Sequence, residues 1–286
     1  MKLHDDCRPC LLKQMEATAR AAGADEGLVG QVAGAVGSEL ERLWDPACSP
    51  PAISAPLYHL TGSICGEDDP FLAAKVRYTR EALRMLPGVQ ARILESGDPF
   101  EAAVRTAIAG NIIDFGTGIY SGLFDLGKTL EDFLQKPLFI DNVKELQARS
   151  ASARKILYIG DNAGETVFDR PLLRLLDGAE LYYAAKDGAV INDATVKDAT
   201  LAGVHLHARI VSTGTRTPGT LLDQCSDEFL ELFESADLVI AKGQGNFETL
   251  TELPSLGQLF LLFTVKCPVA ARHLDAAMGD MVVMKW

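Results

Sequence analysis

The feature that most constrains the fold of this chain is a series of short apolar segments that begins after about residue 135. Helix-length stretches separate these segments, and continuous apolar segments are typical of strands that are buried on both faces. Such strands occur mostly in parallel sheets covered by helices. The sequence therefore predicts an α/β protein whose main part is a three-layer α/β/α sandwich with a mostly parallel sheet. The predicted strands are Pro137–Ile140, Lys155–Ile159, Glu180–Ala184, Ala208–Val211, Asp237–Ala241 and Leu259–Val265.

The first hundred residues have the spacing of helices rather than of strands. Asp6 is the expected N-cap of a helix that starts at Cys7, and Pro87-Gly88 is expected to end the last helix of this part. We therefore divide the chain into a helical N-terminal region, residues 1–100, and an α/β/α domain, residues 101–286. Helices are predicted from Cys7 onward, over Gly27–Leu43, from Asp69 to Leu86 and, as an interrupted pair, over Glu101–Leu126.

Charge and composition argue against several classes of function. The 286 residues include 27 Lys and Arg against 39 Asp and Glu, a net charge of −12, which argues against binding to a nucleic-acid backbone. No apolar segment approaches the roughly 20 residues that span a bilayer, and the N-terminus lacks the apolar segment of a signal peptide. Six cysteines without a disulfide-framework spacing favour a reducing, cytoplasmic location.

Polar side chains follow the predicted strands at the edge of the sheet where ligands bind in such folds. Asp161 and Asn162 follow the second predicted strand, and Asp193 follows the third. These residues offer hard oxygen ligands and no thiolate or imidazole, which suits Mg²⁺ or Mn²⁺ better than Zn²⁺ or copper. In the alternative interpretation, each aspartate only caps the helix that comes after its strand.

Two lysines follow later strands at the same predicted edge. Lys242 opens a glycine-containing turn at Gly243, and Lys266 follows the last predicted strand. Lysine neutralises phosphoryl oxygens, and glycine lets backbone N–H groups approach them. Together with the oxygen ligands, these residues predict a site for phosphoryl transfer or phosphate hydrolysis. In the alternative interpretation, both are ordinary surface lysines.

Two further pairs of residues carry a less specific signal. Asn111 and Asp114 share one face of an apolar helical stretch, where either an active-site role or structural hydrogen bonding would satisfy their need for partners. Cys7 and Cys10 share one face at a helix N-terminus, but there is no second CxxC to complete a four-ligand zinc site. Because both thiols are far in sequence from the predicted site, we expect a structural or regulatory role for them.

These motifs resemble those of the damage-control phosphatase family, and within it those of the short prokaryotic subfamily marked by an N-terminal CxxC. The resemblance runs nearly from end to end of the chain. Its most specific parts are Asp161–Glu165 and Lys242–Asn246, in this order. The full set of matching motifs is Cys7-x-x-Cys10, Ala109–Gly116, Asp161–Glu165, Ile191–Thr195, Pro218–Thr220 and Lys242–Asn246.

The resemblance implies a helical region on an α/β/α sandwich, and a divalent-metal-dependent phosphatase for small phosphate monoesters such as sugar phosphates and damaged or surplus phosphometabolites. It implies that Asp161, Asn162 and Asp193 carry the catalysis and hold the metal, which is Mn²⁺, Ni²⁺, Co²⁺ or Mg²⁺ in this family. The residues expected to bind the substrate are Lys242, Gly243, Asn246, Lys266, Asn111, Asp114 and Glu165, with Glu165 or Asp114 orienting the attacking water. Another branch of the family has an Arg-Thr-x-Lys signature at this place in the sequence. The residues here are Phe263-Thr264-Val265-Lys266, so the arginine is absent, and this chain need not act on the substrate of that branch.

Two rival functions stay open at this point. One is an S-adenosylmethionine-dependent carboxyl methyltransferase, against which stand the two lysines and the lack of a glycine-rich loop after the first strand. The other is a non-enzymatic thiol- or metal-binding protein centred on Cys7 and Cys10. The expected partner is one small phosphorylated metabolite, with no nucleic acid and no membrane, and the sequence does not indicate an oligomeric state.

Overall fold

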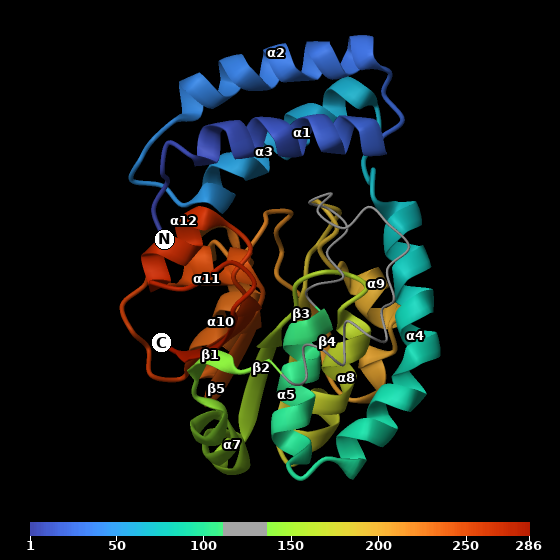
Figure 1. Ribbon diagram of the computed structural model, residues 1–286, viewed down its shortest axis with the longest axis vertical. Helices are drawn as coiled ribbons and strands as arrows, with labels where there is room; N and C mark the ends of the chain where they lie inside the picture. The colour runs from blue at the N-terminus through green and yellow to red at the C-terminus, as the bar shows by residue number, and fades with distance from the viewer. Residues whose placement is uncertain (111–135) are drawn as a thin grey trace.

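The computed structural model describes residues 1–110 and 136–286. In this part of the chain, three helices form a layer of their own, and the other helices cover one sheet (Figure 1). The helices are α1 (Cys7–Ala21), α2 (Glu26–Leu43), α3 (Pro50–Cys65), α4 (Leu72–Glu95), α5 (Pro99–Gly110), α7 (Val143–Ser152), α8 (Thr166–Leu175), α9 (Val196–Leu201), α10 (Asp227–Ser235), α11 (Gln244–Leu250) and α12 (Pro268–Leu274). The strands are β1 (Leu138–Asp141), β2 (Lys155–Ile159), β3 (Glu180–Ala185), β4 (Arg209–Ser212), β5 (Leu238–Lys242), β6 (Leu259–Thr264) and β7 (Met281–Lys285).

The sheet has the doubly wound topology that creates a binding site at one edge. Its strand order is β1-β7-β6-β5-β2-β3-β4, and the strands from β6 to β4 run parallel to one another. The chain builds outward from β2 to β3 and β4, and then returns to place β5 and β6 on the other side of β2. The switch point therefore lies between β2 and β5, where a crevice opens beyond the strand ends in folds of this kind.

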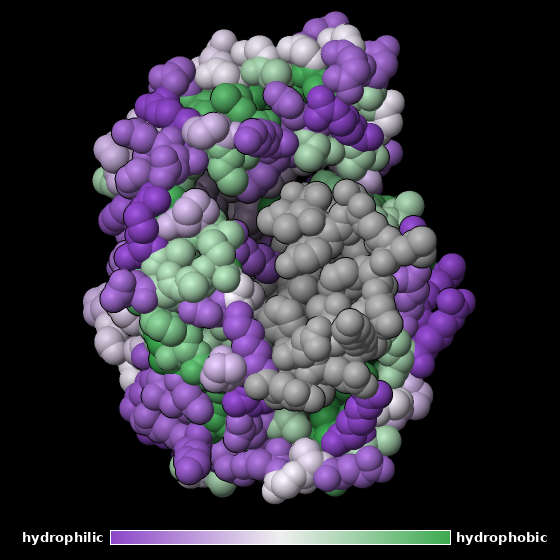
Figure 2. Space-filling view, viewed as in Figure 1, coloured by the Kyte–Doolittle hydropathy of each residue, from purple (hydrophilic) through white to green (hydrophobic). Residues whose placement is uncertain are grey.

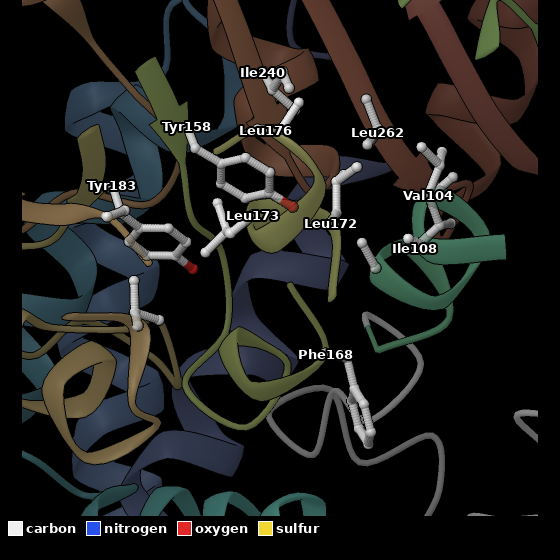
Figure 3. Packing of buried hydrophobic residues seen from close by; sticks show 14 of the residues in the cluster. Val104, Ile108, Tyr158, Phe168, Leu172, Leu173, Leu176, Tyr183, Ile240 and Leu262 are labelled. Atoms are coloured by element: carbon white, nitrogen blue, oxygen red, sulfur yellow. The ribbon is translucent and has the colours of Figure 1, made fainter. Parts of the chain in front are cut away.

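Successive residues of the central strands enter two different cores, because side chains of a strand alternate between its faces. Ile156 and Tyr158 of β2 pack in the core under α4, α5, α7, α8 and α9, part of which is drawn in Figure 3. Leu157 and Ile159 pack in the other core, under α10, α11 and α12. The two groups of helices lie on opposite sides of the sheet in Figure 1. The predicted α/β/α sandwich with a mostly parallel sheet is thus confirmed.

Helices α1, α2 and α3 have a core separate from those of the sheet. Leu11, Met15, Val36 and Leu57 are buried in it. Val190, from the loop after β3, packs in the same core, so the helical layer sits on the loops that follow the strands. In Figure 1 this layer, in blue, is at the top of the molecule.

Several local predictions were wrong, each for a physical reason. Asp6 precedes α1 but its side chain does not cap it, because the carboxylate instead pairs with Arg272. Helix α4 continues through Pro87 to Glu95, since burial of its apolar face in the sheet's core outweighs the cost of one proline, about 3 kcal/mol. Two elements, α3 and β7, were not predicted. Strand β7 pairs antiparallel with β6, an arrangement that the pattern of apolar segments does not specify.

The division of the chain at residue 100 stays a prediction. The packing favours a boundary nearer Gly66, because Ala82 and Leu86 of α4 are buried in the core of the sheet rather than in that of α1–α3. The predicted second helix after α5 lies outside the described residues. Among the described helices, none is long and apolar enough to cross a membrane.

Candidate active site

A cavity of about 390 Å³ lies at the switch point, between the helical layer and the loops that follow β2, β3 and β5. Its walls include Asp161, Asn162 and Asp193 from the sheet edge, and Leu11 and Tyr58 from the layer above. Figure 2 shows the surface hollowed between these two parts of the molecule. The structure therefore brings together the oxygen ligands that the sequence predicted on two different strands.

Backbone hydrogen bonds join the two loops that carry these ligands. The Ala163 N–H donates to Asn192 O at 2.9 Å, and the Ala194 N–H donates to Asp161 O at 2.7 Å. As a result Asn162 lies opposite Asp193 in an isolated bridge. Neither aspartate caps a helix: Glu165 precedes α8, and α9 is capped by Thr195. The helix-cap interpretation is thus wrong for both aspartates.

The amide of Asn162 has a defined orientation. Its Nδ2 donates to Asp161 Oδ2 and to Glu165 Oε2, both at 3.0 Å. These two bonds use both protons of the nitrogen, so the amide oxygen, Oδ1, is the donor atom left for a cation. Two aspartates and one amide oxygen form a hard, all-oxygen set that suits Mg²⁺ or Mn²⁺. Among the described residues, no cluster made only of His, Cys, Asp or Glu side chains, three or more in number, could hold a metal ion. The set above differs from such a cluster because its third member is an asparagine.

Gly243 lies directly under this set. Its φ is +83°, and a Cβ at this position would overlap the carboxylate of Asp161. Its N–H donates to Leu262 O at 3.0 Å, within the β5–β6 pairing. Gly243 is therefore needed for the close approach of Asp161 and for the unusual backbone conformation, while its N–H already has a partner.

Lys242 is fully buried, so the surface-lysine interpretation is wrong for it. Its ammonium donates to Glu165 Oε1, Asp169 Oδ1 and Ala107 O, each at 2.7 Å. Burial lowers the pKa of Lys242, but the two carboxylates outweigh this effect and hold the pKa above its ordinary value. In the structure the charge of Lys242 thus neutralises buried carboxylates rather than facing the cavity.

Asn246 also acts inside the protein. Its Nδ2 donates to Lys242 O at 2.7 Å and to Gly160 O at 3.4 Å, and its Oδ1 accepts from Thr220 Oγ1 at 2.7 Å. These bonds tie the ends of β2 and β5 to the loop that follows β4. Of the predicted lysines, Lys266 is the one that lines the cavity. Asn111 and Asp114 lie outside the described residues.

Sequence reasoning missed three features of this site. Lys186 directly follows β3, and Lys242 is the last residue of β5, so the similar place of Lys186 at a strand end was an available signal. The ammonium of Lys186 donates to Gly219 O and lies 3.7 Å from Asp193 Oδ2. Cys7 and Cys10, although far away in sequence, line the cavity. Glu248, one helical turn beyond Gln244, also lines it, and burial raises the pKa of Glu248 to about 7 against the lowering effects of Gln244 and the N-terminal ammonium.

The architecture defines the class of protein as doubly wound α/β/α, with hard oxygen donors in a cavity at the switch point of the sheet. Within this class, the chain belongs to the family of ARMT1-like damage-control phosphatase domains, whose family profile matches residues 3–282. A damage-control phosphatase of Pyrococcus horikoshii is 37% identical over 288 residues, which cover 100% of this chain and 98% of that protein. A damage-control phosphatase of Archaeoglobus fulgidus is 32% identical over 292 residues, covering 99% and 98%.

A solved structure gives the same result at the level of the fold. A DUF89 family protein from Pyrococcus horikoshii superposes with a TM-score of 0.87 at 36% sequence identity, and the match covers 100% of this chain and 99% of that chain. The family resemblance of the sequence motifs is therefore confirmed. This membership does not favour the methyltransferase alternative, and the narrower CxxC subfamily stays a prediction.

Proposed function

We propose that this chain is a divalent-metal-dependent phosphatase that hydrolyses small phosphate monoesters, such as sugar phosphates or damaged or surplus phosphometabolites. The observation that carries the proposal is the convergence of Asp161, Asn162 and Asp193 on one cavity at the switch point. The names of the relatives support the same class of reaction. A cytoplasmic location, suggested by the cysteine spacing, stays a prediction.

In this proposal Asp161, Asn162 and Asp193 hold the metal ion. When bound there, Mg²⁺, Mn²⁺, Co²⁺ or Ni²⁺ would polarise a phosphoryl oxygen and make water a better nucleophile. Lys266 lines the same cavity and neutralises a second phosphoryl oxygen. Lys186 stabilises this set of ligands, because its ammonium partly balances the charge of Asp193. The wall formed by α1 and α3 receives the rest of the substrate.

The residues predicted to bind the substrate have different roles in the site. Lys266 keeps its predicted contact with the phosphoryl group. Lys242, Gly243 and Asn246 shape the site from within, since their hydrogen bonds are made inside the protein. Glu165 is fully buried with both carboxylate oxygens engaged, which does not support its role in orienting water.

The test is phosphate release from a panel of sugar phosphates and nucleotides, after chelation and with Mn²⁺ or Mg²⁺ restored. Chelation should abolish turnover and the metal should restore it. Asp161→Asn keeps the size of the side chain beside Gly243, and we expect it to lower kcat/KM by about 100-fold or more, because charge on the metal ligand is lost. The exposed Asp177 provides the control: Asp177→Asn should behave as the unaltered protein. Full turnover of Asp161→Asn with metal supplied would contradict the site.

A further inference from the structure

A buried chain of hydrogen bonds leads away from the proposed site, and no step of the proposed reaction uses it. At its far end, the hydroxyls of Tyr158 and Tyr183 donate to Asp169 Oδ1 at 2.7 Å and Oδ2 at 2.9 Å. Figure 3 shows the two rings side by side, with both hydroxyl groups pointing the same way. Each of these three side chains is fully buried. Burying polar side chains costs free energy unless they are hydrogen-bonded, so a network of this kind in a core calls for an explanation other than hydrophobic packing.

The chain continues through a buried cation to the amide of Asn162. Lys242 joins Asp169 to Glu165 with two bonds of 2.7 Å. Glu165 then accepts from Asn162 Nδ2 at 3.0 Å through its other oxygen. Because Lys242 takes Oε1 and is itself held by Asp169 and by Ala107 O, the Glu165 carboxylate has little freedom to rotate. Its Oε2 is thus aimed at Asn162.

An amide side chain presents a donor on one side and an acceptor on the other. A carboxylate oxygen that accepts from Nδ2 turns the nitrogen inward and therefore turns Oδ1 the opposite way. We propose that Glu165, held in place by Lys242, is a positioning residue that fixes the amide orientation of Asn162 so that Oδ1 is presented to the cation. The inference rests on the proposed metal site, and it gives Glu165 and Lys242 a role without contact with the substrate.

Glu165→Gln tests this directly. A glutamine has one oxygen, and the cation of Lys242 competes for it more strongly than the neutral amide of Asn162 does. The NH₂ of Gln then faces Asn162 and selects the opposite amide orientation. We expect the Mn²⁺ affinity of the metal-free protein, measured by calorimetry, to fall about tenfold or more. An Mn²⁺ affinity equal to that of the unaltered protein would overturn the inference.

Two further variants separate orientation from stability. Tyr158→Phe removes one buried hydrogen bond at the far end of the same chain, so it should lower the unfolding stability but leave the Mn²⁺ affinity within about threefold. Asn162→Asp has an oxygen on both sides, so in its background Glu165→Gln should no longer weaken Mn²⁺ binding. A tenfold loss that persists in the Asn162→Asp background would overturn the inference. If Glu165→Gln does not fold, Glu165→Asp, which withdraws the acceptor by one methylene, replaces it in the same comparisons.

Asp193→Asn distinguishes this inference from the proposed function on which it rests. If Asp193→Asn loses Mn²⁺ binding while Glu165→Gln keeps it, the metal site stands and only the positioning role is wrong. If neither variant changes Mn²⁺ binding, the metal site itself is wrong, and the positioning role falls with it.

Discussion

At the scale of single residues, surroundings decide what a charged side chain does. Lys242 and Lys266 have the same sequence signal, since each directly follows a predicted apolar strand, Asp237–Ala241 or Leu259–Val265. Lys242 is enclosed by Glu165 and Asp169, whereas Lys266 lines the cavity. A lysine among buried carboxylates stays charged to balance them, so the first has an internal role and the second is placed to meet a substrate.

Glu248 provides a prediction at this scale. Its Oε1 accepts from Gln244 Nε2 at 2.7 Å, and the described titratable groups that interact with it include the thiols of Cys7, Cys10 and Cys267 and the N-terminal ammonium. Burial raises the pKa of Glu248 to about 7 in the folded protein, above its ordinary value. The folded state therefore binds the proton more tightly than the unfolded state. The stabilisation is complete below the unfolded pKa and is lost as the pH rises through the folded pKa.

Glu248→Gln removes this dependence on pH. The free energy of unfolding of the variant, relative to the unaltered protein, should increase by about 3 kcal/mol between pH 4 and pH 8. Denaturant unfolding at several pH values, without metal, measures the difference. Parallel pH profiles for the two proteins would show that the carboxyl is not perturbed.

At the scale of elements, the backbone conformation of the turn between β5 and α11 determines whether a proposed metal ligand can take its place. Gly243 holds a φ of +83° and leaves the space that the Asp161 carboxylate occupies. Gly23 has nearly the same φ, +82°, but a Cβ there would meet no atom within 4 Å. Gly23 is therefore a control for alanine at a positive φ without overlap with a neighbouring side chain.

Both Gly243→Ala and Gly23→Ala should lose stability, because alanine is disfavoured at a positive φ, and Gly243→Ala should lose more, because a ψ of 160° at this φ is a conformation essentially restricted to glycine. Only Gly243→Ala should also displace Asp161, and we expect its kcat/KM and Mn²⁺ affinity to fall about tenfold or more. Steady-state kinetics and calorimetry on both variants make the comparison. Normal Mn²⁺ affinity in a folded Gly243→Ala would mean that the carboxylate does not need its present position.

The elements themselves were predictable to different degrees. Strand β2 was predicted with the bounds that it has, because the continuous apolar residues that follow Lys155 are typical of a strand covered on both faces. Helix α4 was predicted too short, because a proline is a local signal whereas the burial of Val89 and Ile93 beyond it depends on the sheet. Strand β7 was missed because its place between β1 and β6 is a matter of long-range pairing.

At the scale of the whole molecule, the layer of α1–α3 closes the cavity over the sheet edge. Cys7 and Cys10 reach the site through this layer, since the cavity wall includes both. Burial raises the pKa of both thiols, which opposes the formation of thiolates. The proposed ligands of the metal are oxygens, so the thiols form part of the wall and take no part in the proposed chemistry.

The double variant Cys7→Ser, Cys10→Ser should therefore keep kcat within about threefold in reducing buffer, because serine differs little in size and no thiolate is used. KM is free to change, since the wall contacts the substrate. Kinetics, metal content and circular dichroism on the same preparation make the test. A complete loss of turnover in a folded, metal-loaded variant would move the chemistry from the oxygen ligands to the thiols.

The sequence by itself determined the α/β/α class, the central strands and the residue types that follow them, because these depend on local apolar pattern and on the topology of parallel sheets. Only the tertiary structure decided which of these residues face the cavity. The loop of Asp161 meets that of Asp193, Lys242 turns inward to Glu165, and α1 brings Cys7 and Cys10 to the wall. The physical reason is that burial and hydrogen-bond partners come from segments that are distant in the chain, and no local pattern records them.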